Sequence, residues 1–243
     1  NFTNTILSTY GTEFYRKATH GEGFIRGFFN VIKSATTGTG AALERLFITG
    51  VSPVTMDDVT SGFNIGTNIT NDSWFNDLVG FSENELREML EYYKEQGVLQ
   101  ESIDEIVAMM KPNYDNYCFS EDTLEQCMFN SDMALYFLKS FVLHHKKPKE
   151  IVDPNIRTDF NKLAYLIKLD HGLGENFSVI KEIAEQGEII TDIVTHFSAL
   201  EMTDPSNFKS LLFYFGLLSI KGVDMVGRPI LHVPNLVVRE QSF

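Results

Sequence analysis

The feature that most constrains the fold is a series of segments with helical apolar spacing, which begins at residue 81. Ser82-Glu83-Asn84-Glu85 is a capping box, in which the Ser82 and Glu85 side chains satisfy backbone amides at a helix start. Phe81 and Leu86 occupy the positions of a hydrophobic staple around it. One apolar helix face follows, made by Leu86, Met89, Leu90 and Tyr93, and Gly97 can end the helix. This pattern predicts a helical region rather than a β-sandwich.

The same apolar spacing continues over the next hundred residues. Ile103, Ile106, Val107 and Met110 predict a second helix, which Pro112 is expected to end. Further helices are predicted near 132–145, 159–169, 177–186 and 189–199. Residues 81–200 are therefore expected to be predominantly helical.

The residues before this region have a mixed pattern. Residues 10–34 predict mainly helix, which His20–Gly23 can interrupt and the breaker run Thr36–Gly40 ends. Leu43–Gly50 is short and apolar towards its end, so we predict a buried strand there. Residues 51–80 are rich in polar residues and glycine. We assign residues 1–80 to an α/β remnant.

The last residues differ again. Asp204-Pro205 predicts a capped helix start, and Gly216 can cap the end of that helix. Leu217–Ile220 and Ile230–Val233 are short strand-like runs. A helix followed by a β-hairpin is the way a winged-helix unit finishes, so residues 201–243 are predicted to be winged-helix-like. The expected fold class is mainly α with a small α/β remnant.

Composition and charge narrow the classes of function. The formal charge of −13 disfavours contact with phosphate backbones, so direct nucleic-acid binding is not expected. Lys146-Lys147-Pro148-Lys149 is interpreted as a solvated loop. No stretch approaches the roughly 18 apolar residues of a membrane helix, and no signal-peptide pattern is present. The two cysteines, Cys118 and Cys127, are expected to be reduced thiols of a cytoplasmic protein.

Several segments resemble motifs of a bacterial AAA-ATPase-like family, whose members often carry a PD-(D/E)XK-type nuclease domain. Leu46–Asp58 is similar to the FxTGV(S/T) strand of that family. The other matches follow in order: Leu78–Glu85 (FGFTxxEV), Tyr114–Phe119 (YDGYxF), Asn130–Leu138 (NPxSVLxFL), and Ser210–Arg239 (SLLYxxGxLTI…IPNxEVR). Asn116 replaces a family glycine and tolerates left-handed backbone, and Ser219 replaces a threonine.

The resemblance implies that the chain is the end of a P-loop ATPase core (1–80), a helical lid (81–200) and a winged-helix-like end (201–243). No G-x-x-x-x-G-K-[ST] motif occurs in the 243 residues. Asn1-Phe2-Thr3 resembles the residues that follow the acidic Mg²⁺-binding strand of the family. We therefore expect the parent protein to bind ATP and Mg²⁺, and we expect neither cofactor for this chain alone.

The candidate site residues come from the same resemblance. Thr49 and Ser52 are the candidate catalytic sensor residues, which would reach the γ-phosphate or the attacking water. Gly50 and Arg26 are the candidate nucleotide-binding residues. Thr49 and Ser52 have an alternative role, which is to satisfy backbone groups at a strand end. Asp57 and Asp58 suggest a metal pair, but a helix dipole also favours acidic residues there, so no metal site is assigned.

Two functions are compatible with these observations. The first is a regulatory fragment of a P-loop NTPase, whose parent couples ATP binding or hydrolysis to a conformational change. Its partners would be the upstream ATPase core and, where the parent carries one, a downstream nuclease domain, with no membrane. The second is a non-catalytic helical interaction module derived from such an ATPase.

Overall fold

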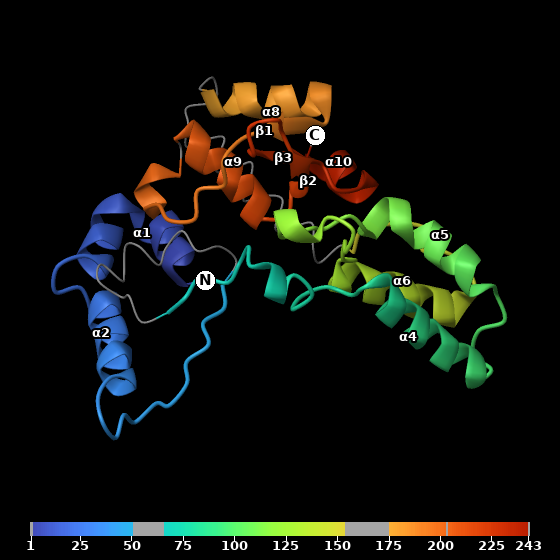
Figure 1. The fold of residues 1–243 in the computed structure, drawn as a ribbon, viewed down its shortest axis with the longest axis horizontal. Helices are drawn as coiled ribbons and strands as arrows, with labels where there is room; N and C mark the ends of the chain where they lie inside the picture. Colours follow the sequence, from blue (N-terminus) through green and yellow to red (C-terminus); the bar gives the residue numbers. More distant parts are fainter. Residues whose placement is uncertain (1, 51–65, 154–174, 203, 243) are drawn as a thin grey trace. The chain divides into compact units, whose positions relative to one another are not determined.

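The computed structural model describes residues 2–50, 66–153, 175–202 and 204–242. Within these ranges the protein has eight α-helices and one three-stranded antiparallel sheet (Figure 1), which confirms the expected mainly helical class. The helices are α1 (Phe2–Thr19), α2 (Phe24–Thr36), α4 (Glu83–Glu95), α5 (Ile103–Tyr114), α6 (Ser131–His144), α8 (Glu175–Gln186), α9 (Pro205–Tyr214) and α10 (Leu236–Ser242). The strands are β1 (Glu188–Ile190), β2 (Ser219–Val223) and β3 (Pro229–His232). Short 3-10 turns are η1 (Ser73–Phe75), η2 (Glu121–Thr123) and η3 (Ala199–Glu201).

The chain divides into two compact units that interleave along the sequence. Unit 1 comprises residues 1–68 and 193–215, and unit 2 comprises 69–192 and 216–243. The division at residues 80 and 200 made from the sequence stays a prediction. None of the described helices has the length and apolar character that crossing a membrane requires.

Unit 1 begins with two helices joined by a tight turn at the predicted interruption. Gly23 permits this turn, because a Cβ atom there would lie 2.2 Å from the carbonyl oxygen of Ala18. Ala18 of α1 and Ile25 and Phe29 of α2 form a small core, with Ile6 and Ile32 packed against it. The α2 helix ends at Thr36, where the breaker run begins, as the sequence predicts.

The strand predicted over residues 43–50 is not formed. These residues are extended but carry no strand assignment, and in the described ranges only β1, β2 and β3 build a sheet. An extended segment becomes a strand only when a neighbour pairs with its N–H and C=O groups. This prediction was wrong because apolar spacing alone does not supply that neighbour.

Unit 1 also contains α9, which starts as the sequence predicts. The Asp204 carboxylate accepts hydrogen bonds from the backbone amides of Ser206 and Asn207, and Pro205 occupies the first turn. The Ser210 hydroxyl accepts from the Val194 amide at 2.8 Å. The Tyr214 hydroxyl also donates to the Val194 carbonyl at 3.2 Å, so both backbone groups of Val194 bond to α9.

The core of unit 2 lies among α4, α5 and α6. The capping box is present, since the Ser82 amide donates to Glu85 Oε2 at 2.8 Å and the Glu85 amide donates to Ser82 Oγ at 3.2 Å. The buried members of the core include Leu86, Leu90, Ile106, Met110, Tyr114, Phe137 and Phe141. The predicted helices near 132–145 and 177–186 are confirmed as α6 and α8, while the one at 159–169 lies outside the described residues.

The α5 helix continues beyond the proline that was expected to end it. Pro112 lies inside α5, which extends to Tyr114. A proline removes one backbone hydrogen bond, but tertiary contacts can offset that loss. Tyr114 is fully buried, and its hydroxyl donates to the carbonyl of Ile151 at 2.9 Å. Burial of this ring holds the last turn of α5 in place.

The sheet of unit 2 has the strand order β1-β3-β2, with both pairs antiparallel. Ile189 of β1 lies opposite Leu231 of β3, and both side chains are buried. The helix predicted over 189–199 is therefore wrong. Strand β1, which pairs with the central strand β3, replaces the beginning of that helix, because pairing and burial in a sheet outweigh local helical spacing. The β2–β3 hairpin itself was predicted and is confirmed.

Candidate functional site

Three of the four sequence-predicted site residues lie in the described part of the chain. Thr49 and Gly50 lie in the exposed extended segment, and Arg26 is half-buried on α2. Ser52, Asp57 and Asp58 lie outside the described residues. The structure therefore leaves the sensor role of Thr49 and Ser52, and the nucleotide-binding role of Gly50 and Arg26, as predictions.

Unit 1 exposes a second apolar stripe on α2. Ile25, Phe29 and Ile32 face the small core. Phe24, Phe28 and Val31 follow the i, i+4, i+7 spacing of another face, and these three side chains are 66%, 56% and 68% exposed. A helix with apolar residues on two faces is suited to burial on both sides.

Other apolar side chains of unit 1 are exposed in the same way. Tyr10 and Phe14 of α1 are 64% and 44% exposed, and their ring centroids lie 5.0 Å apart. Phe47, in the extended segment, is 65% exposed. Apolar side chains exposed in such numbers are typical of a protein that contacts another domain or protein there. The six exposed side chains Tyr10, Phe14, Phe24, Phe28, Val31 and Phe47 are together called the apolar face of unit 1 below.

Unit 2 brings together residues from motifs that are far apart in the sequence. The amide nitrogens of Tyr117 and Met128 each donate to the other residue's carbonyl oxygen, at 3.1 and 2.8 Å. Ser219 of β2 joins this pair, because its hydroxyl accepts from the Cys118 amide at 2.7 Å. The Asn130 amide donates to the carbonyl of Tyr114 at 2.9 Å. We call this arrangement the motif junction.

The end of the chain is attached to the motif junction through two asparagines. Asn235 Nδ2 donates to the Asp115 carbonyl at 3.0 Å, and Asn235 Oδ1 accepts from the Val238 amide at 3.1 Å. Asn116 Nδ2 donates to the Pro234 carbonyl at 3.0 Å. Asn235 is buried, so its amide group satisfies backbone groups that would otherwise be desolvated without partners. The sequence had shown these residues only as separate motifs.

Two ionisable side chains at the motif junction, those of Asp115 and Tyr117, have pKa values shifted by burial. Burial raises the pKa of the Asp115 carboxyl, which the Asn116 amide and Lys111 partly oppose. Burial also raises the pKa of Tyr117, against hydrogen bonds with Asn235 and Asn130. Both groups are held by neighbours on several sides.

Four charged residues of α4 and α5 pair with one another. Glu83 contacts both Lys111 and Arg87, at 2.6 and 2.8 Å, and Arg87 contacts Asp104 at 2.7 Å. Hydrogen bonds from Lys111 and then Arg87 lower the pKa of Glu83. Across the described residues, no group of three or more His, Cys, Asp or Glu side chains is arranged to hold a metal ion. These pairs link two helices and do not form a reaction centre.

We expect Asn116→Ala to destabilise unit 2 by about 1–2 kcal/mol, because the residue has φ of +73° and its side chain makes a hydrogen bond. Asn116→Gly removes the same hydrogen bond without the backbone strain, so it should cost about 1 kcal/mol or less. Urea denaturation followed by circular dichroism measures both. Equal losses in the two variants would show that the left-handed backbone is not what selects Asn116.

Comparison with known proteins adds one finding to this geometry. Residues 1–60 match the family model described as a predicted AAA-ATPase. The match covers α1, α2 and the extended segment, which carry the apolar face of unit 1. No curated protein and no solved structure matches the chain. The AAA-ATPase-like match thus stops before the described part of unit 2 that contains the motif junction.

Proposed function

We propose that this chain is the regulatory end of an AAA-ATPase-like protein. In this proposal the phosphate-binding loop and the Mg²⁺-binding carboxylates belong to the parent protein outside the 243 residues. The chain then couples nucleotide binding or hydrolysis to a conformational change. By itself it neither binds ATP tightly nor hydrolyses it, since it lacks a phosphate-binding loop.

The observation that carries the proposal is the apolar face of unit 1. Five of its six side chains are aromatic, and all six belong to the segment that matches the AAA-ATPase-like family. Burying one such aromatic side chain stabilises a contact by about 1.5–3 kcal/mol, so packing another domain against all six side chains would be strongly favourable. The family match suggests that this domain is the remainder of an ATPase core.

Thr49, Ser52, Gly50 and Arg26 keep their proposed roles within that larger assembly. Thr49 or Ser52 would position the attacking water or the γ-phosphate, and Gly50 would allow close approach of the backbone. Arg26 would place positive charge near the phosphates. The exposure of the segment around Thr49 is compatible with a role that begins only when the core packs against it.

The partners in this proposal are the ATPase core and, where the parent carries one, a PD-(D/E)XK-type nuclease domain. The charge of −13 makes the chain itself a poor ligand for nucleic acid. The winged-helix-like end is assigned to contacts within the protein. Its helix α9 carries Lys209 as its sole Lys or Arg.

The test is ATP hydrolysis by the complete gene product, measured beside the 243-residue chain. We expect Mg²⁺-dependent turnover by the complete product and none by the chain alone. Thr49→Ala in the complete product should lower kcat by about 10²-fold with little change in nucleotide affinity, because it removes a positioned group used in the transition state. Thr49→Ser keeps the hydroxyl and should retain most of the activity.

The same preparations separate the proposal from its alternatives. A melting temperature measured for each variant shows whether a lost rate reflects a lost fold. Phe28→Ser should weaken turnover of the complete product if the apolar face packs on the core. Phe177→Ser is the matched control, since Phe177 is an exposed residue of α8 in unit 2. A complete product that binds no nucleotide would instead favour a non-catalytic interaction module.

A further inference from the structure

The two cysteines of the chain lie opposite each other across a short antiparallel pair. Tyr117 and Met128 form a hydrogen-bonded pair in that ladder, with N···O distances of 3.1 and 2.8 Å. The next position along the ladder holds Cys118 on one side and Cys127 on the other. In an antiparallel ladder this is a non-hydrogen-bonded pair, whose Cα atoms lie about 4.5 Å apart. Disulfides span Cα distances of roughly 4.4–6.8 Å.

The two side chains lie close enough for each thiol to shift the pKa of the other, and both cysteines are free. Cys118 Sγ also donates to the Ser120 carbonyl at 3.1 Å, and Cys127 Sγ donates to the Leu124 carbonyl at 3.5 Å. Cys118 is buried and Cys127 is half-buried, so small oxidants have access from the Cys127 side.

The neighbouring thiols also shift each other's pKa. The interaction with Cys127 lowers the pKa of the Cys118 thiol, against the opposing effect of burial. The same interaction raises the pKa of the Cys127 thiol, and burial and the carboxylates of Asp115 and Glu125 add to that rise. Cys118 is therefore the sulfur that ionises more readily, and Cys127 the one that keeps its proton. A thiolate beside a neutral thiol is the reactive combination for disulfide formation.

We propose that Cys118 and Cys127 form a reversible dithiol–disulfide switch that a hydroperoxide oxidises. The thiolate of one cysteine attacks a peroxide oxygen, the O–O bond breaks, and a sulfenic acid and hydroxide are formed. The second thiol attacks that sulfur, the S–S bond forms, and water leaves with the thiol proton. Overall, two thiols and one hydrogen peroxide give one disulfide and two waters. A dithiol reductant reverses the step by exchange.

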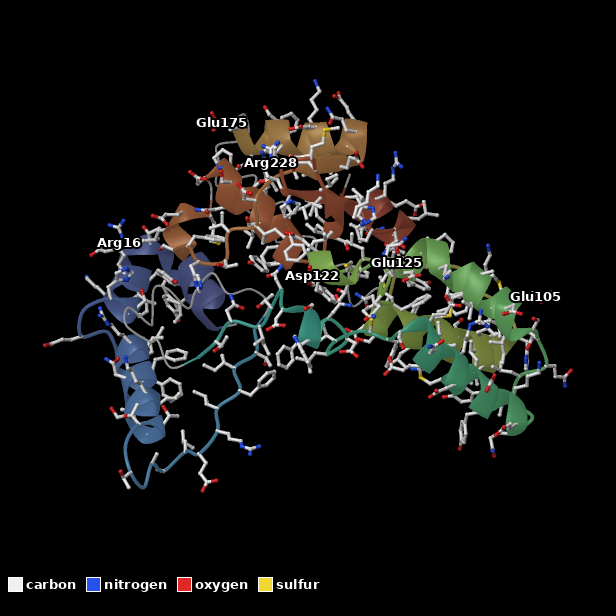
Figure 2. All side chains as sticks on the ribbon, in the orientation of Figure 1. Arg16, Glu105, Asp122, Glu125, Glu175 and Arg228 are labelled. Atoms are coloured by element: carbon white, nitrogen blue, oxygen red, sulfur yellow. The ribbon has the colours of Figure 1, made fainter. Side chains whose placement is uncertain are left out.

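The disulfide would hold three segments of unit 2 in place relative to one another, namely the loop from residue 118 to residue 127, strand β2 and the residue that follows η1. It closes the loop from residue 118 to residue 127, which includes η2 and the labelled residues Asp122 and Glu125 (Figure 2). Cys118 contacts β2 through Ser219, and the Ile220 amide donates to the Cys118 carbonyl at 3.3 Å. Asn76, which follows η1, accepts from the Phe119 amide and donates to the Gln126 carbonyl, so it spans both sides of the loop.

The experiment treats the purified 243-residue chain with hydrogen peroxide after full reduction. We expect titratable thiols to fall from two to zero, and the intact mass to fall by two hydrogen atoms while the protein stays monomeric. Peptide mapping should find residues 118 and 127 joined. The melting temperature of unit 2 should rise by about 5 °C, and dithiothreitol should reverse every change. Retention of both thiols, joining between two chains, or oxygen addition without a bridge would each overturn the proposal.

Two variants keep the test valid if one of them folds poorly. Cys127→Ser changes the half-buried position, and Cys118→Ala changes the buried one. Each should lose the peroxide-induced rise in melting temperature while circular dichroism under reducing conditions stays close to that of the wild type. The trivalent arsenical phenylarsine oxide is a second probe, since it binds dithiols far more tightly than single thiols. It should bind the reduced wild type in a 1:1 ratio and neither variant; equal binding to all three would also contradict the proposal.

Discussion

Phe137→Ala should lower the free energy of unfolding of unit 2 by about 3–5 kcal/mol. Phe137 is 2% exposed and lies in the middle of the core between α5 and α6. Its ring stacks on Phe141, with centroids 5.6 Å apart, and meets the edge of Tyr114 at 5.9 Å. Truncation removes the ring and leaves a cavity that its packed neighbours fill only in part. Urea denaturation followed by circular dichroism gives the loss.

Phe177→Ala is the matched control for this prediction. Phe177 is also a helical phenylalanine of unit 2, on α8, but its side chain is 49% exposed. The same truncation should therefore change the stability by less than about 1 kcal/mol. Hydrogen exchange of amides in α5 and α6 identifies which part of the protein has loosened. A small effect at Phe137, or equal effects at the two sites, would contradict the packing of this core.

Gly80→Ala should destabilise unit 2 by about 2–4 kcal/mol, from two causes that act together. Gly80 has φ of +93°, a conformation that costs an alanine about 1–2 kcal/mol. A Cβ atom there would also lie 2.8 Å from the Phe129 carbonyl oxygen and 2.9 Å from Met128 Cβ. The clash would push apart Phe81 and Phe129, whose amides donate to each other's carbonyls at 3.0 and 2.7 Å. Thermal and urea denaturation measure the loss.

Gly97→Ala separates the two causes. Gly97 has a similarly positive φ of +71°, but no atom lies within 4 Å of a Cβ placed on it. Its substitution should cost about 1–2 kcal/mol, the backbone contribution alone. If Gly80→Ala were no more harmful than Gly97→Ala, the close approach of residues 80 and 129 would not exist in solution. Loss of protection at the Phe81 and Phe129 amides would support the predicted mechanism directly.

The features predicted well from the sequence depend on residues that are close together in the chain. The Ser82 capping box and the Asp204 cap are both present. Each rests on hydrogen bonds within three or four residues, so the local sequence is sufficient to predict it. Apolar spacing likewise predicted α4, α6 and α8, because a helix makes its backbone hydrogen bonds internally.

The features that the sequence did not predict depend on partners far away in the chain. Helical spacing near Ile189 gave way to a strand, since β3 supplies a partner some forty residues later. Among the described residues, no strand pairs with the segment around Thr49, so the predicted strand is not formed there. The pairing of Cys118 with Cys127 follows from the register of Tyr117 and Met128, which no local pattern specifies. Strand pairing and register are therefore decided by the tertiary structure, because the backbone groups involved are satisfied only between segments.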